Sequence, residues 1–189
     1  MVWVLVAILA IALAAAVVML VRQQRSRQLR EGFGPEYDRT IAETGDRRAA
    51  ERELAERRER RSELEIRELD ADSRDRYAER WRKTQRTFVD QPAAAVADAD
   101  GLVAEVMHER GYPVEEDFER RAADISVDHP VVVENYRAAH AISVRAGHDD
   151  ASTEDLRQAL VHFRALFAEL LGQDESTQHD PDDAKEVHR

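Results

Sequence analysis

The sequence predicts an all-α protein with an N-terminal transmembrane helix, a charged helical stalk, a C-terminal bundle of about five helices and a disordered acidic tail. Three observations predict this fold. The first 21 residues carry no charged side chain, residues 46–66 are almost entirely Arg, Glu, Ala and Leu, and residues 69–172 place apolar side chains at helical spacing. No segment alternates apolar and polar residues with a period of two, so we expect no sheet.

Residues 1–21 have the length and composition of a transmembrane helix. At roughly 1.5 Å per residue they reach about 31 Å, the thickness of the hydrocarbon core of a bilayer. A cleaved signal peptide is the alternative, but it has a basic start, a shorter apolar core and a small-residue cleavage site. This segment starts uncharged and ends in Val17-Val18-Met19-Leu20-Val21. We therefore expect a single-pass anchor that is retained, with the lipid bilayer as its first partner.

A basic juxtamembrane segment and hinge follow at residues 22–45. Positive charge stays on the cytoplasmic side, so four arginines directly after the span predict that the N-terminus is outside and the C-terminal domain cytoplasmic. The same arginines can contact anionic lipid headgroups. They are Arg22, Arg25, Arg27 and Arg30.

Glycine and proline divide this hinge from the segments on either side. The two glycines and the proline of Gly32-Phe33-Gly34-Pro35 break the first helix, and Pro35 suits the first turn of a new short helix. Gly45 ends that helix, and Asp46 can cap the next one. We expect a bend between the span and the stalk.

Residues 46–68 form the predicted charged helical stalk, one continuous helix to about Ile66. Glu53→Arg57 and Glu56→Arg60 have the favourable i,i+4 order. A coiled-coil register would place Ala50, Leu54 and Leu64 on one seam, but it also places Arg57 and Arg61 there. We expect a solvated spacer of about 30 Å, with weak self-association, and hence a homo-oligomer, as the alternative.

Residues 69–172 form the predicted helical bundle domain, and residues 173–189 the disordered tail. The first three helices span about 71–89, 92–110 and 115–125. The fourth begins at Asp128-His129-Pro130, with Asp128 as its cap, and ends near Gly147. Ser152 and Asp155 resemble a capping box for the fifth, which Gly172 ends.

One polar cluster could carry chemistry. Tyr136 and His140 share a helix face, and further polar side chains lie at that helix's start or beside them. A His–Asp acid/base pair in a small pocket is the functional interpretation, whereas a cap and core residues are the structural one, which we favour. The cluster is Asp128, His129, Tyr136, Arg137 and His140.

Other candidate sites are weaker. No two histidines in the body have the spacing of helix-borne metal ligands, so we expect no metal site. Tyr77, Trp81 and Phe88 could line a peptide-binding groove, but this spacing is more typical of a core.

The composition excludes several classes of protein. A formal net charge of −11 disfavours nucleic acid as a partner. The absence of cysteine excludes disulfides, thiolate metal sites and a cysteine nucleophile. Phosphate-binding loops and the motifs of dinucleotide enzymes, serine hydrolases and zinc proteases do not occur in the sequence. We expect no catalysis and no cofactor.

Four strings of residues resemble a family of bacterial, largely actinobacterial, single-pass membrane-anchored helical proteins of unknown function. The family resemblance implies one anchor and a helical body, and it assigns no catalytic residues. The strings are Phe33-Gly34-Pro35-Glu36-Tyr37-Asp38-Arg39-Thr40, Arg110-Gly111-Tyr112-Pro113-Val114, Asp124-Ile125-Ser126-Val127-Asp128-His129-Pro130 and residues 151–160.

Together these features favour a membrane-anchored helical adaptor or scaffold that acts through a protein partner at the cytoplasmic membrane. Three alternatives stay open. The bundle could be a small-ligand sensor with a pocket near Tyr136 and His140, or an enzyme using Asp128, His129 and His140. The protein could also face the envelope, if the topology is reversed.

Overall fold

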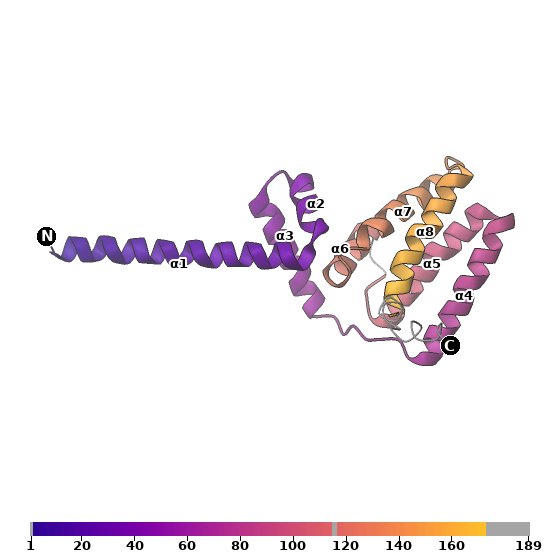
Figure 1. Cartoon of the computed structure of the whole chain (residues 1–189), viewed down its shortest axis with the longest axis horizontal. Helices are drawn as coiled ribbons and strands as arrows, with labels where there is room; N and C mark the ends of the chain where they lie inside the picture. Colours follow the sequence, from indigo (N-terminus) through magenta and orange to yellow (C-terminus); the bar gives the residue numbers. More distant parts are fainter. Residues whose placement is uncertain (1, 115–116, 173–189) are drawn as a thin grey trace, which may run out of the picture. The chain divides into compact units, whose positions relative to one another are not determined.

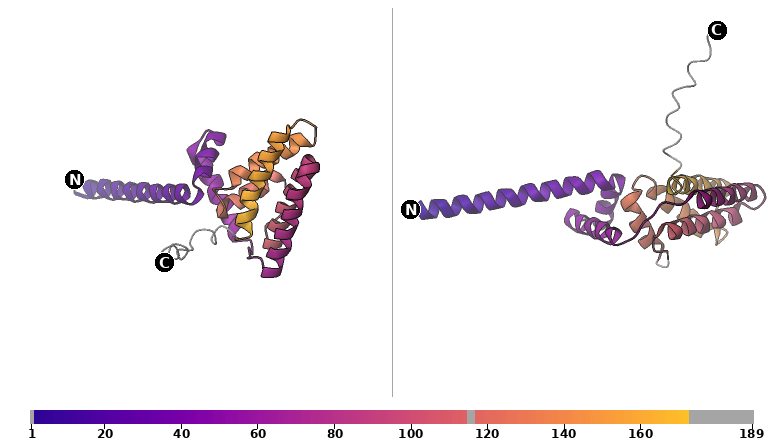
Figure 2. Two further views of the ribbon diagram at one scale, coloured as in Figure 1. Left: turned by 45° about the vertical axis from the view of Figure 1, so that its right-hand side comes forward. Right: turned by 90° about the horizontal axis from the view of Figure 1, so that it is seen from below.

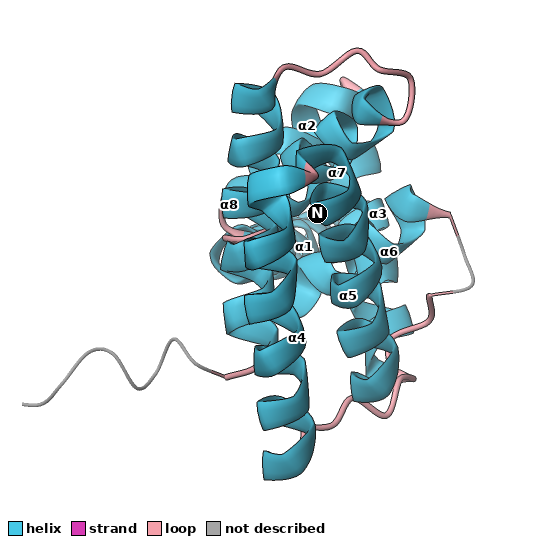
Figure 3. Ribbon diagram, turned by 90° about the vertical axis from the view of Figure 1, so that its right-hand side faces the viewer, coloured by secondary structure: helices cyan, strands magenta, loops and turns pink. Residues whose placement is uncertain are grey.

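The described part of the chain is entirely helical. The computed structural model describes residues 2–114 and 117–172, without the side chains at 2, 4–8 and 10–12. These ranges contain eight α-helices and no strand (Figures 1 and 3). The prediction of an all-α protein is therefore confirmed. The chain divides into two compact units, Met1–Glu59 and Arg60–Arg189, and the predicted disordered tail lies outside the described residues.

The first unit contains a long helix, α1 (Val2–Phe33), and the start of a helical hairpin, α2 (Pro35–Thr44) and α3 (Arg47–Ser62). Gly34 and Gly45 have φ angles of 49° and 67°, which place both turns in conformations that favour glycine. Pro35 lies in the first turn of α2, and the Asp46 carboxylate accepts the backbone N–H of Arg48 at 3.0 Å. The predicted break, proline start and cap are confirmed, and α1 extends well past the hairpin (Figure 2).

The expectation of a solvated spacer is wrong. Ala50, Leu54 and Arg57 are buried along one face of α3. The seam that the sequence offered as a weak coiled-coil register is therefore covered within the monomer. Helix α3 also ends at Ser62 rather than near Ile66, because tertiary contacts of the next residues override a strong local helix propensity.

Within the residues that the structure describes, no helix is long and apolar enough to cross a membrane. The side chains of the predicted span at residues 1–21 are described only in part. Residue 1 and the side chains at 2, 4–8 and 10–12 are not described, so the described side chains of this segment are those at 3, 9 and 13–21.

The second unit is a bundle of α4 (Ala71–Asp90), α5 (Pro92–Arg110), α6 (Phe118–Asp128), α7 (Val133–Ala146) and α8 (Thr153–Leu170). These helices agree with the predicted ranges to within a few residues, except at the start of α6, where Asp117 is the N-cap, and at the start of α7. The capping box of Ser152 and Asp155 is confirmed. Residues 115–116, where the third helix was expected to begin, lie outside the described residues.

Helix α5 is central to this unit, because it packs against α4, α7 and α8 (Figures 1 and 2). Its predicted apolar stripe is fully buried or nearly so, including Val96, Ala99, Val103 and Met107. Trp81 belongs to the same core and stacks on Phe167 of α8 with ring centroids 4.7 Å apart. Trp81 is thus a core residue and not the exposed anchor of a peptide groove.

The segment between α3 and α4 is fixed along the end of α5. The backbone N–H of Arg67 donates to the carbonyl of Arg110 at 2.9 Å, and the Arg67 guanidinium donates to the carbonyl of Glu109 at 2.8 Å. Gly111, with a φ of 99°, forms the turn after α5 directly beside the backbone of Glu65. We call residues 63–70 the strap.

Candidate functional site

The predicted polar cluster does not form one site. Asp128 is the last residue of α6 and not the cap of α7, whose N-cap is Val132 without a side-chain hydrogen bond. The expected cap is wrong because α6 continues three residues beyond Ile125, so that Asp128 faces other partners. Its carboxylate is paired with the Arg61 guanidinium and accepts the Tyr112 hydroxyl.

His129 and His140 each contact a different carboxylate. Nδ1 of His129 lies 2.6 Å from Oε1 of Glu169 on α8, and the histidine is buried. Nδ1 of His140 lies 3.0 Å from Oδ2 of Asp100 on α5. Asp128, His129 and His140 therefore serve three separate contacts, and this arrangement disfavours a shared acid/base centre.

The space beside Tyr136 and His140 is filled by an aromatic ring. Phe118 of α6 stacks on His140 with centroids 3.6 Å apart and planes at 6°, and its centroid lies 4.9 Å from that of Tyr136. Tyr136 and Arg137 are both buried. The structure thus brings Tyr136 and His140 together, as their i,i+4 spacing predicts. Both rings pack against Phe118, which takes the place of a ligand.

Phenols in this region are held in the neutral form. Burial, together with the hydrogen bond to Asp128, raises the pKa of Tyr112. Burial and the nearby charge of Asp100 raise the pKa of Tyr136. Neither tyrosine is prepared to act as a base or a nucleophile, and both pack as core residues with a polar end. Among the described residues, no group of three or more His, Asp or Glu side chains could hold a metal ion.

A different surface feature lies on α1. Every described side chain from Leu13 to Val21 is exposed, and so are Trp3 and Leu9. Trp3 is 85% exposed and Met19 72% exposed. Because neighbouring positions of a helix point in different directions, this run of residues exposes apolar surface on all sides of α1.

The four arginines after this apolar segment divide into two pairs. Arg27 contacts Glu31 at 2.9 Å, and Arg30 lies 3.7 Å from Asp38 and near the face of Tyr37. Arg22 and Arg25 are exposed, and neither has a hydrogen bond or an ion pair with the described residues. The sequence could not separate the pairs, since the partner of Arg30 comes from α2.

Next to them, a polar network connects all three helices of the first unit. The Ser26 and Tyr37 hydroxyls donate to the Glu51 carboxylate at 2.7 Å and 2.8 Å. Arg47 donates from Nε to Glu51 at 2.9 Å and from a terminal nitrogen to Ser26 at 2.5 Å. Burial opposes ionisation of Glu51, but these donors together lower its pKa, while the bond to Glu51 raises the pKa of Arg47. Both side chains are held charged.

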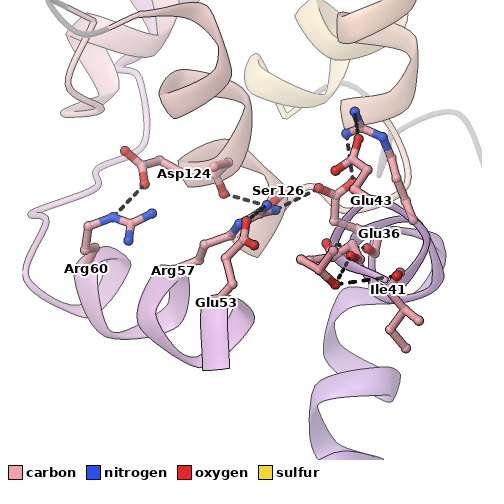
Figure 4. A network of polar contacts seen from close by, with 12 residues as sticks. Glu36, Ile41, Glu43, Glu53, Arg57, Arg60, Asp124 and Ser126 are labelled. Atoms are coloured by element: carbon pink, nitrogen blue, oxygen red, sulfur yellow. Dashed lines mark hydrogen bonds and ion pairs between the residues drawn. The ribbon is translucent and has the colours of Figure 1, made fainter. Parts of the chain in front are cut away.

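A buried ion pair fixes the other end of the hairpin. Arg57 of α3 donates to Glu36 of α2 at 2.8 Å and to Glu53 at 2.5 Å, and the Arg57 and Glu36 side chains are 6% and 2% exposed (Figure 4). The predicted Glu53→Arg57 pair is confirmed. Arg60 instead lies 3.5 Å from Asp124 (Figure 4). The burial of Glu36 was missed, because nothing local distinguishes it from the many exposed glutamates.

No family model, curated protein or solved structure matches the chain. The resemblance to membrane-anchored actinobacterial proteins therefore stays a prediction.

Proposed function

We propose that the chain is a single-pass membrane protein whose helical body acts as an adaptor, through contact with another protein at the cytoplasmic face. The observation that carries the proposal is the run of exposed apolar side chains on α1, followed by arginines. A helix that is apolar on all sides needs non-aqueous surroundings. Exposing each Leu or Val side chain to water costs about 1.5–3 kcal/mol, and lipid removes this cost.

Helical structure fits this location. Each backbone N–H and C=O inside α1 is paired within the helix, as lipid requires. The helix continues without a break from Val2 to Phe33 and thus carries the chain past the arginines before its first turn. The positive-inside rule then places the hairpin and the bundle in the cytoplasm.

A binding role for the bundle, in preference to catalysis, is supported by the structural contacts that its polar residues make. Asp128, His129 and His140 are engaged in structural contacts, and Phe118 fills the space where a ligand pocket was considered. Exposed apolar side chains remain on the bundle surface, among them Val89 and Val131. Such side chains are suited to contact with a protein partner.

The anchor is tested by membrane retention. The triple variant Leu9→Arg, Leu13→Arg and Val17→Arg places three charges in the exposed apolar segment. The matched control, Val89→Arg, Val131→Arg and Val161→Arg, places three charges on exposed valines of the bundle. After alkaline carbonate washing of membranes, we expect the wild type and the control in the pellet and the anchor variant in the supernatant. An unchanged distribution of the anchor variant, or a soluble wild type, contradicts the anchor.

The adaptor role is tested by photo-crosslinking in cells. A photoreactive amino acid is placed at Val89, Val131, Val144 or Val161, which are exposed and spread over the bundle. A discrete adduct that depends on position supports a specific partner, and an adduct of twice the chain's mass identifies a second copy. If every position yields only the uncrosslinked chain, the body does not work by protein contact.

A further inference from the structure

The hairpin returns towards the apolar end of α1. Arg47, at the start of α3, contacts Ser26, whereas Arg58, three turns later, donates to the carbonyl of Gln28 at 3.5 Å and lies over the ring of Phe33 at 5.6 Å. Within the first unit, α3 therefore begins beside Ser26 and reaches Gln28 and Phe33 at Arg58. The tip of the hairpin, residues 44–48, lies beside Ser26, about 7.5 Å along the helix from Val21.

The unpaired arginines of α1 lie within one turn of Ser26, which Arg47 contacts. Ser26, Leu29 and Phe33 form the buried face of α1. Arg22 precedes Ser26 by four residues and Arg25 precedes Leu29 by four, so both arginines extend the same face by one turn towards Val21. Three basic residues, Arg22, Arg25 and Arg47, thus belong to the part of the first unit around Ser26, where the start of α3 meets α1. We call this part the corner.

The charge in this corner is available to an anion. Arg22 and Arg25 are exposed and have no partner among the described residues. Arg47 donates to Ser26 and Glu51, and its side chain is 63% exposed, so part of its guanidinium faces solvent. The Glu51 carboxylate is the nearest negative charge, and it already accepts hydrogen bonds from Ser26, Tyr37 and Arg47. Positive charge is therefore in excess.

We propose that Arg22, Arg25 and Arg47 form a binding site for the phosphate of an anionic lipid headgroup. The proposal rests on the membrane anchor proposed above and adds the residues and the ligand. A lipid is favoured over a free phosphate because the corner directly follows the exposed apolar segment that ends at Val21. The headgroup layer extends about 5–7 Å beyond the hydrocarbon core, which covers Arg22 and Arg25 and reaches the level of Ser26. Guanidinium forks bind phosphate oxygens in pairs.

The experiment measures the preference of the full chain for an anionic lipid. Fluorescent phosphatidylglycerol and phosphatidylcholine are titrated into the protein in neutral detergent micelles, and the ratio of their affinities is compared between variants. We expect Arg22→Gln, Arg25→Gln and Arg47→Gln each to reduce the preference by about fivefold. Arg27→Gln with Arg30→Gln is the control, because both arginines follow on the same helix but are paired with acids.

Each outcome has a distinct meaning. If the control pair lowers the preference as much as Arg22→Gln with Arg25→Gln, the attraction is a diffuse surface charge and the site is refuted. If millimolar inorganic phosphate displaces the fluorescent lipid from the protein, the ligand is a free anion and the lipid assignment is overturned. Arg22 and Arg25 make no contacts that folding needs, so their variants stay informative even if Arg47→Gln disturbs the hairpin. Carbonate washing separates the two proposals. A wild-type protein that leaves the membrane refutes the anchor, whereas arginine variants that stay in the membrane but lose the lipid preference support the site.

Discussion

At the scale of single residues, buried or half-buried carboxylates hold the helices in register. Glu109, near the end of α5, accepts the hydroxyls of Ser73 and Tyr77 from α4, both at 2.6 Å. These two hydrogen bonds lower the pKa of Glu109. Burial and the same carboxylate raise the pKa of Tyr77 to about 12. One contact between two helices therefore favours the charged acid and the neutral phenol.

The Glu109 contact predicts an acid-sensitive bundle. A carboxyl whose pKa is lower in the folded state stabilises the fold above its unfolded pKa, near 4.5, and loses that contribution as the pH falls through the folded pKa. We expect the free energy of unfolding to decline below about pH 4.5 and to decline less steeply in Glu109→Gln. Urea unfolding followed by circular dichroism from pH 3 to pH 7 measures this. The control is Glu119→Gln on the exposed side of α6; if both variants keep the wild-type slope, the Glu109 contact does not govern it.

At the scale of helices, the periodicity of apolar residues predicted the bundle helices correctly but not the buried face of α3. The bundle helices were found because their apolar residues recur at helical spacing and because Gly111, Pro92 and the Ser152 capping box mark their ends. The buried face of α3 was misjudged, since Arg57 on a seam argues against burial unless its partner Glu36, from another helix, is known. Long-range pairs of this kind leave no signal in a single sequence.

In the candidate site, too, local relations were predicted from the sequence and long-range contacts were not. The i,i+4 relation of Tyr136 and His140 was predicted correctly, but Phe118 between them, and the separate carboxylates of the two histidines, come from helices distant in the sequence. Asp128 looked like a cap because Pro130 follows it, and only the structure reveals that Arg61 and Tyr112 hold it instead.

The strap provides a prediction at this scale. A Cβ atom at Gly111 would lie 2.5 Å from the carbonyl oxygen of Glu65 in the strap, and the φ of 99° disfavours any side chain. We expect Gly111→Ala to reduce the free energy of unfolding by about 2–3 kcal/mol, from backbone strain and displacement of the strap.

Gly101 is the matched control for this substitution. It lies inside the same helix, α5, with no atom within 4 Å of the position of a Cβ. Gly101→Ala should raise the free energy of unfolding by about 0.5–1 kcal/mol, because alanine favours the helix. Chemical denaturation of both variants decides the point. Equal effects of the two substitutions are incompatible with a strap held against the Gly111 turn.

At the scale of the whole molecule, charge and hydrophobicity are unevenly distributed. The chain has a formal net charge of −11, yet its first 30 residues combine an uncharged apolar segment with four arginines and no acid. The cysteine-free sequence offers a direct way to locate the start of α1 and the helical body relative to a membrane. Any introduced cysteine is the only thiol, so its labelling reports one position.

The central claim is that α1 crosses a membrane with the helical body in the cytoplasm, and topology measures it most directly. Single-cysteine variants Trp3→Cys and Val89→Cys, at positions 85% and 82% exposed, are treated with a membrane-impermeant maleimide in intact and lysed cells. We predict labelling of Trp3→Cys in intact cells and labelling of Val89→Cys only after lysis. Labelling of Val89→Cys in intact cells would place the body in the envelope, and labelling of both variants only after lysis would contradict a membrane span.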